Sequence, residues 1–150
     1  MGKHFTIDAD FWTSAAVADS FSAEEKFLYL FLCTSKHLSM CGCCEISTRT
    51  IAIETGLEGY MVERALSRLQ KEHGVVCRDE ETRELFLVNW IMNNWNRSPK
   101  WRKRVTRDIS EIKSQRLRRV ANAQLLKAQE ESEQAERAGL RPGFRTNFRP

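Results

Sequence analysis

Residues 47–74 read STRTIAIETGLEGYMVERALSRLQKEHG, and their pattern is the most informative in the chain. Ser47 has a side-chain oxygen that can accept hydrogen bonds from free backbone amides, so we expect a helix to begin after it. Gly56 separates two helical segments, where a sharp turn needs a left-handed backbone. Beyond it, apolar residues recur at helical spacing: Val62, Ala65, Leu66 and Leu69. The pattern predicts a short helix, a glycine turn and a longer helix with one buried side.

The opposite side of the longer helix is polar and largely cationic. It carries Tyr60, Glu63, Arg64, Ser67, Arg68 and Lys71. A glycine turn before a helix with a buried face and a cationic face is typical of a DNA-binding helix-turn-helix. The alternative is an ordinary helical hairpin inside a core, in which Glu63, Arg64 and Lys71 form a solvated, mutually paired face.

The flanking segments predict further elements around this pair of helices. Residues 22–25, SAEE, form a capping box that opens a helix running to about Ser35, and residues 41–46 read as a short strand. Residues 75–78 and 85–88 read as a hairpin around an acidic turn at residues 79–82. The order helix, strand, helix, helix, strand, strand is that of a winged-helix domain. We therefore expect an α+β, mostly α fold: a winged helix-turn-helix domain followed by a basic helical C-terminal extension.

Charge divides the 150-residue chain into two parts. Residues 1–96 hold 9 Lys or Arg against 14 Asp or Glu, a net charge of −5, whereas residues 97–150 hold 15 against 6, a net charge of +9. This split indicates a mildly acidic folded part and a tail that binds a polyanion. We expect a winged-helix DNA-binding domain at 1–96, a basic helical extension at 97–138 that opens with Pro99, and a disordered tail at 139–150.

Composition also limits cellular location and chemistry. No apolar run approaches the ~20 residues that a membrane span needs, and the five cysteines, an odd number, favour a reducing compartment. We therefore expect a cytoplasmic protein without membrane contact. His37 and the C-x-C-C run at 41–44 lack the second ligand pair of a structural zinc site, and no catalytic motif is present. The sequence predicts no enzyme, no cofactor and no metal.

The expected DNA contacts lie on three segments. The longer helix of the pair fits the major groove, while Thr48 and Arg49 begin the shorter helix, where free amides favour phosphate. The predicted wing offers only Arg78 and Arg83 beside its acidic turn. The winged-helix domain alone should therefore bind DNA weakly. Most affinity is expected from the extension, with a steep dependence on salt. The complete set is Thr48, Arg49, Tyr60, Arg64, Ser67, Arg68, Lys71, Arg78, Arg83, Lys100, Trp101, Arg102, Lys103, Arg104 and Arg107.

Trp101 lies within this cationic run and has two interpretations. Its indole can stack on a base or a ribose, or it can pack on Trp95 and the hairpin.

Six segments carry a resemblance to a known family. They are FSAEEKFLYLFLCTS (21–35), MCGCCEIS (40–47), TIAIETGLEGYMVERALSRLQKEHGVV (50–76), ELFLVNW (84–90), NNWNRSPKW (93–101) and EIKS (111–114). From about Phe5 to Ser114 the chain resembles the N-terminal winged-helix domain of phage and prophage replication proteins, the replisome organisers related to the primosomal DnaD group. The resemblance implies duplex contact by Tyr60, Arg64 and Arg68, and attachment to DNA or a partner by the region after Pro99.

Such proteins bind an origin and recruit the replicative helicase or its loader. The implied partners are double-stranded DNA, a helicase, helicase loader or other replication protein, and a further copy of the chain. Fuller members carry a second C-terminal helical domain, where this sequence has a basic helix and a short tail. We therefore expect a DNA-binding part that works with another protein.

Two other functions fit the same residues. A small GntR-like winged-helix transcriptional regulator would share TIAIETGL and VERALSRL. A winged-helix protein-docking adaptor would use the acidic wing as its contact surface.

Overall fold

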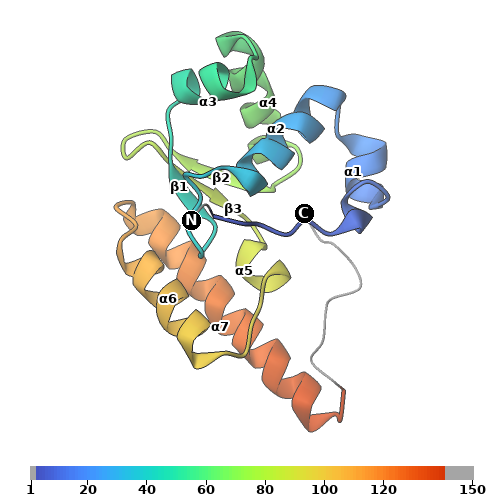
Figure 1. Cartoon of the computed structure of the whole chain (residues 1–150), viewed down its shortest axis with the longest axis vertical. Helices are drawn as coiled ribbons and strands as arrows, with labels where there is room; N and C mark the ends of the chain where they lie inside the picture. Colours follow the sequence, from blue (N-terminus) through green and yellow to red (C-terminus); the bar gives the residue numbers. More distant parts are fainter. Residues whose placement is uncertain (1–2, 141–150) are drawn as a thin grey trace.

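The computed structural model describes residues 3–140, and its fold is α+β and mostly helical (Figure 1). The predicted tail therefore lies outside the described residues from position 141 onward. The elements in chain order are η1 (Ala9–Phe11), α1 (Ala15–Ser20), α2 (Ala23–Thr34), β1 (Cys43–Glu45), α3 (Thr48–Thr55), α4 (Gly59–Lys71), β2 (Val76–Asp79), β3 (Glu84–Leu87), α5 (Trp90–Asn93), α6 (Pro99–Ser110) and α7 (Gln115–Arg137).

A three-stranded antiparallel sheet lies at the centre, with the strand order β1-β3-β2. Phe86 on the middle strand is opposite Cys43 on one side and Cys77 on the other. All four residues of β3 are buried, and their side chains alternate between two apolar clusters: Leu85 and Leu87 join one, Phe86 the other. Both faces of the sheet are therefore covered.

The first layer contains α1 to α4 and forms the larger apolar cluster. Helix α2 begins with the predicted capping box, in which the Ser22 hydroxyl and the Glu25 carboxylate each accept a hydrogen bond from the other residue's backbone amide. Its buried residues pack against α4, and the Tyr29 ring stacks on Phe11 with centroids 5.8 Å apart. This packing fixes α4 against α2 on one face of the sheet.

The predicted turn between the two central helices is present. Helix α3 begins after the Ser47 cap, whose hydroxyl accepts from the amide of Thr50 at 3.1 Å. It ends at Gly56, whose φ of 77° is left-handed. Helix α4 then leads into the β2–β3 hairpin.

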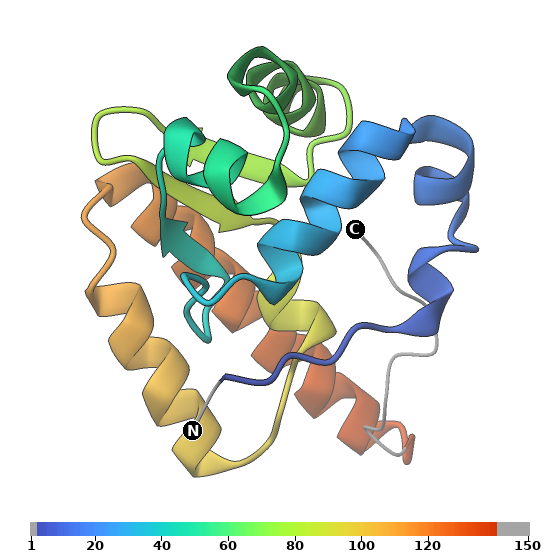
Figure 2. The same cartoon turned by 45° about the horizontal axis from the view of Figure 1, so that its top comes forward.

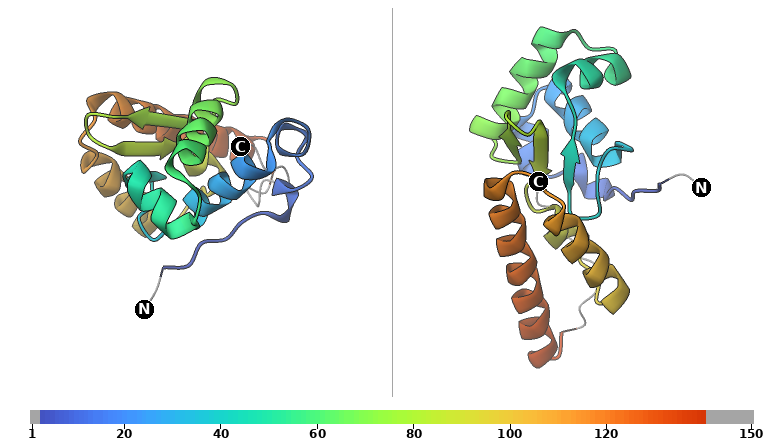
Figure 3. Two further views of the ribbon diagram at one scale, coloured as in Figure 1. Left: turned by 90° about the horizontal axis from the view of Figure 1, so that it is seen from above. Right: turned by 90° about the vertical axis from the view of Figure 1, so that its left-hand side faces the viewer.

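The second layer contains α5, α6 and α7 and covers the opposite face of the sheet (Figure 3). Val105 and Ile109 of α6 and Leu117 and Ala121 of α7 are buried with Phe86 of β3. The region predicted as a basic extension thus consists of two helices, joined by a turn at residues 111–114, and shares an apolar core with the sheet.

None of the helices within residues 3–140 combines the length and the apolar character that crossing a membrane requires.

Candidate nucleic-acid interface

The exposed side of α4 is a row of four residues that we call the α4 stripe: Tyr60, Arg64, Ser67 and Lys71. They lie opposite the buried face of the helix. The Tyr60 residue is 64% exposed, the Arg64 side chain is 58% exposed, and Lys71 is also exposed. Viewed from the end of the molecule that carries α3 and α4, these helices lie in front of the sheet, and the α6–α7 hairpin lies behind it (Figure 3). The stripe is therefore open to a large partner.

One flank of the stripe is tied to the hairpin by Glu63. Its carboxylate accepts two hydrogen bonds from the Arg78 guanidinium, each at 3.1 Å, and a third from the Thr48 hydroxyl. The hydrogen bonds from Arg78, opposed by partial burial and aided by Thr48, hold the pKa of Glu63 below its ordinary value. Neither Arg64 nor Lys71 is its partner. Glu63 thus joins the start of α3, the middle of α4 and strand β2.

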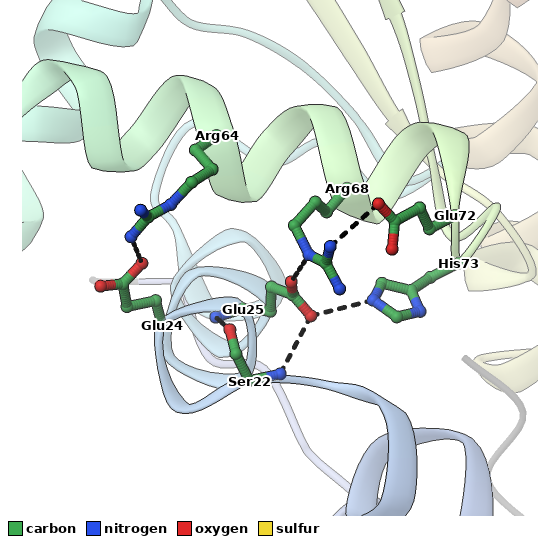
Figure 4. A network of polar contacts seen from close by, with 7 residues as sticks. All are labelled: Ser22, Glu24, Glu25, Arg64, Arg68, Glu72 and His73. Carbon is green, nitrogen blue, oxygen red and sulfur yellow. Dashed lines mark hydrogen bonds and ion pairs between the residues drawn. The ribbon is translucent and has the colours of Figure 1, made fainter.

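The other flank is tied to α2 by Glu25, a carboxylate that is 1% exposed (Figure 4). It accepts from the Arg68 guanidinium, from His73 Nε2 at 2.9 Å and from the Ser22 amide at 3.0 Å. Arg68 also donates to Glu72 at 2.9 Å. Burial alone would raise the pKa of Glu25, but the hydrogen bonds from Arg68, Ser22 and His73 outweigh it and lower the pKa. Arg68, a predicted DNA contact, therefore binds carboxylates of its own chain.

Arg64 and Arg68 line the same groove, but Arg64 pairs with a partly exposed carboxylate and Arg68 with a buried one. The Arg64 Nη2 donates to Glu24 Oε2 at 2.8 Å, in an open groove between α2 and α4 (Figure 4). The hydrogen bond from Arg64 to Glu24 raises the pKa of the guanidinium. Because water reaches both side chains, this ion pair is weak and exchanges readily for another anion.

Three further predicted contacts have no ion-pair partner among residues 3–140. Arg49 is exposed in the first turn of α3, Lys71 is exposed in the last turn of α4, and Arg83 is exposed in the hairpin turn with a φ of 56°. Lys71 belongs to the α4 stripe, whereas Arg49 and Arg83 lie on the two other elements of the predicted DNA-binding unit. Arg78, by contrast, has a side chain that is only 16% exposed and is bound to Glu63.

A second cationic row, which we call the α6 stripe, lies on the outer side of α6. Its members, Lys100, Lys103, Arg104 and Arg107, follow the spacing i, i+3, i+4 and i+7 and are all exposed. Arg104 lies 3.3 Å from Asp108, and Arg107 lies 4.0 Å from it. Arg102 is also exposed, but it lies beyond the edge of this row.

Trp101 packs on Trp95 in an edge-to-face arrangement, with ring centroids 5.3 Å apart. It is partly buried against the second apolar cluster. Of the two interpretations of this residue, the structure shows the packed one.

The turn between α6 and α7 is bonded to the hairpin. The Lys113 and Ser114 amides donate to Glu84 at 3.0 and 2.7 Å, and the Ser114 hydroxyl donates to Asp79. The Ser114 hydrogen bond, opposed by desolvation, lowers the pKa of Asp79. Part of the predicted acidic wing is therefore an internal contact, while Glu80 and Glu81 remain exposed.

Sequence reasoning did not find Glu24 and Glu25 as partners of the α4 arginines. The capping box predicts that Glu25 bonds within its own helix, but its contacts with Arg68 and His73 span 43 and 48 residues. Because Arg64 and Arg68 share the same residue type and nearly the same helical face, sequence alone gives no signal that separates them.

The part of the chain that the structure describes holds no cluster of three or more potential metal ligands. Cys41, Cys43 and Cys44 are buried free thiols. Burial raises the pKa of Cys44 to about 12, so it is a packing residue and not a reactive thiolate.

Comparisons with models of protein families, with curated proteins and with solved structures find no match for this chain.

Proposed function

We propose that this protein binds duplex DNA through α3, α4 and the β2–β3 hairpin, acting together as a winged helix-turn-helix. The observation that carries the proposal is the α4 stripe, in which Tyr60, Arg64 and Lys71 are exposed and Ser67 is half-buried, while Glu63 and Glu25 fix both of its flanks. A helix held in this way presents its outer side chains in a constant register. Reading base edges in a major groove requires such a rigid helix.

The residues of the stripe have complementary roles in this proposal. Arg64 leaves Glu24 and binds the O6 and N7 atoms of a guanine, while Tyr60 and Ser67 bond a phosphate or a base edge. Lys71 and Arg49 contact phosphates on either side. Thr48, Arg68 and Arg78 serve the interface indirectly, because they hold α4 against its neighbours.

We further propose that the DNA-binding step belongs to phage-type replication initiation, with origin binding followed by recruitment of a helicase, a helicase loader or another replication protein. The support is the sequence resemblance described above. Its segments build α2, β1, α3, α4, β3 and the start of α6. Selection of bound sequences from a random duplex pool supplies the recognised site, and finding that site in a phage or prophage origin supports this role.

The duplex-binding proposal is tested by anisotropy titration of the selected duplex with the full chain. Arg64→Ala should weaken binding about tenfold and relax preference at one base pair, whereas Lys71→Ala should weaken all sequences alike and lower the salt slope by about one. Lys127→Ala, at an exposed position in the second layer, is the matched control and should change nothing. No binding to any duplex at low salt overturns the proposal.

A protein-docking role has one observation in its favour. Exposed Glu80 and Glu81 lie at the hairpin tip, and exposed Ile53 and Tyr60 lie on α3 and α4. Exposed carboxylates of this kind suit a basic protein segment. Failure of duplex binding together with intact folding would favour this second function.

A further inference from the structure

We infer that the α6 stripe binds a second segment of nucleic acid, so that one molecule holds two DNA segments at once. The inference rests on the proposed function for the first segment, which occupies the α4 stripe. It goes beyond that function because α6 would bind the phosphate backbone of a different DNA segment and would not add affinity for the segment on the α4 stripe.

The α4 stripe and the α6 stripe lie in different parts of the molecule. Helices α3 and α4 lie at one end of the long axis of the molecule and α6 and α7 at the other, with the sheet between them (Figure 1). Val105 and Ile109 point from α6 into the core that includes Phe86. The α6 stripe lies on the other side of the helix, so it faces away from the sheet and from α4.

Helix α6 runs with its C-terminal end toward the β2–β3 hairpin. Its C-terminal end leads into the turn that Glu84 and Asp79 bind at the hairpin, so its N-terminal turn is the part farthest from the hairpin (Figure 2). A helix of 12 residues is about 18 Å long. In the proposed arrangement, a duplex seated on α4 and the hairpin would approach α6 from its Arg107 end, and Lys100 and Lys103 lie toward the opposite end of the helix.

The chemistry of the α6 stripe favours a phosphate backbone over an acidic protein. Thr106 and Ser110 lie beside its four cations, and its acidic neighbours, Asp108 and exposed Glu111, lie toward the C-terminal end of α6. No exposed large apolar side chain lies on α6. Protein partners need apolar or aromatic anchors for affinity, whereas phosphate contacts do not. Lys100 and Lys103 have no ion-pair partner among the described residues, so they are available to an external anion.

The position of these cations in the helix supports the same conclusion. Lys100 and Arg102 lie in the first turn of α6 and Lys103 directly after it, near the positive end of the helix dipole, where cations are unfavourable. The Ser98 side chain makes no capping hydrogen bond that would offset this. A bound polyanion would relieve the repulsion, and each phosphate neutralised would release a counterion.

A bridging assay with the full chain tests the inference. A biotinylated duplex carrying the selected site is immobilised, protein is added, and capture of a free fluorescent duplex is measured. The wild type should capture the free duplex, and Lys100→Glu/Lys103→Glu should reduce capture about tenfold or more while anisotropy binding of a single duplex changes less than about twofold. The single change Lys103→Glu should give an intermediate loss, and Lys127→Glu, which alters net charge equally, should capture as the wild type does.

Each other outcome overturns the inference. If the wild type binds one duplex but captures no second one, the proposed function stands and the second site does not. If Lys100→Glu/Lys103→Glu captures normally, self-association explains bridging, which sedimentation of the DNA-free protein would detect. If poly-L-glutamate displaces the second duplex better than DNA of equal charge, the stripe belongs to an acidic protein. If no duplex binds at all, the proposed function fails as well.

Discussion

Arg64 and Glu24 form an exposed ion pair across the groove between α4 and α2, with Nη2 and Oε2 2.8 Å apart. The Arg64 side chain is 58% exposed and that of Glu24 is 32% exposed. The contact therefore holds the guanidinium without burying it. In the proposed complex, the guanidinium must exchange a carboxylate of its own chain for DNA.

This exchange predicts that Glu24→Gln strengthens duplex binding. The substitution removes the charge that competes for Arg64 and one negative charge near the path of the duplex, so affinity should rise about threefold at low salt. The gain should shrink as salt increases, because the ion pair and the DNA contact are both screened. Anisotropy titration over a series of salt concentrations measures both effects.

Asp19→Asn is the matched control, because Asp19 is exposed on α1 and has no ion-pair partner among residues 3–140. It removes the same charge at a distance from Arg64 and should leave affinity unchanged. Equal gains from both variants would mean that net charge, and not the contact with Arg64, sets the effect.

The second prediction concerns the core beneath α6. Ile109 is 1% exposed among residues of both α6 and the sheet, so Ile109→Ala should lower the free energy of unfolding by about 2–4 kcal/mol. Ile53→Ala makes the same change at a residue that is 72% exposed and should cost less than about 0.5 kcal/mol. Urea denaturation of both variants measures the difference. Equal costs would show that α6 is not docked on the sheet.

The sequence predicts the first layer better than the second. The caps at Ser22 and Ser47, the left-handed Gly56 and the apolar period of α4 are local signals, and each element begins or turns where they indicate. The apolar positions Val105 and Ile109 are equally visible in the sequence. The sequence does not show what these residues pack against. Phe86 and Cys43, which lie in the same apolar cluster, have a sequence pattern that an ordinary half-buried strand would also have.

The same limit applies to the site. Helical spacing places Tyr60, Ser67 and Lys71 on the outer side of α4, and the structure agrees. Helical spacing cannot show that Arg68 pairs with the buried Glu25 and Arg64 with the more exposed Glu24, because both partners lie more than 39 residues away in the chain.

The third prediction uses the lowered pKa of Glu25. A carboxyl whose pKa is lower in the folded state stabilises the fold above its unfolded pKa of about 4.3, and this contribution is lost as pH falls through the folded pKa. Glu25→Gln should therefore cost about 1–3 kcal/mol near pH 5.5 and progressively less toward pH 3. Arg68, Glu72 and His73 face this carboxylate and remain in both proteins.

Chemical denaturation at a series of pH values measures how the free energies of unfolding of the wild type and Glu25→Gln approach each other as pH falls. Glu24→Gln, one residue earlier and exposed to water, is the control and should show a small difference from the wild type that does not converge in this way. A constant cost of Glu25→Gln across the pH range would contradict the assignment, because it would mean that the charge of Glu25 contributes nothing.

The fourth prediction compares two glycines with left-handed backbones. Gly42 has a φ of 87° and Gly56 a φ of 77°, so alanine is strained at both. A Cβ at Gly42 would also lie 2.5 Å from Trp90 Cβ and 2.6 Å from Cγ, whereas a Cβ at Gly56 meets nothing within 4 Å. Gly56→Ala should therefore cost about 1 kcal/mol and Gly42→Ala about 2–4 kcal/mol, because overpacking adds to the backbone strain.

Chemical denaturation of the two variants measures both losses in the free energy of unfolding. A second substitution then distinguishes backbone strain from overpacking as the cause of the larger loss. The Gly42 carbonyl accepts from the Leu87 amide at 2.8 Å, so this glycine joins β1 to β3 while Trp90 packs on it. Replacing Trp90 by glycine removes the Cβ and Cγ atoms that the new Cβ would strike. The cost of Gly42→Ala in that background should fall toward the cost of Gly56→Ala, since only the backbone strain would remain. An undiminished cost would place the whole penalty in the backbone and none in the contact with Trp90.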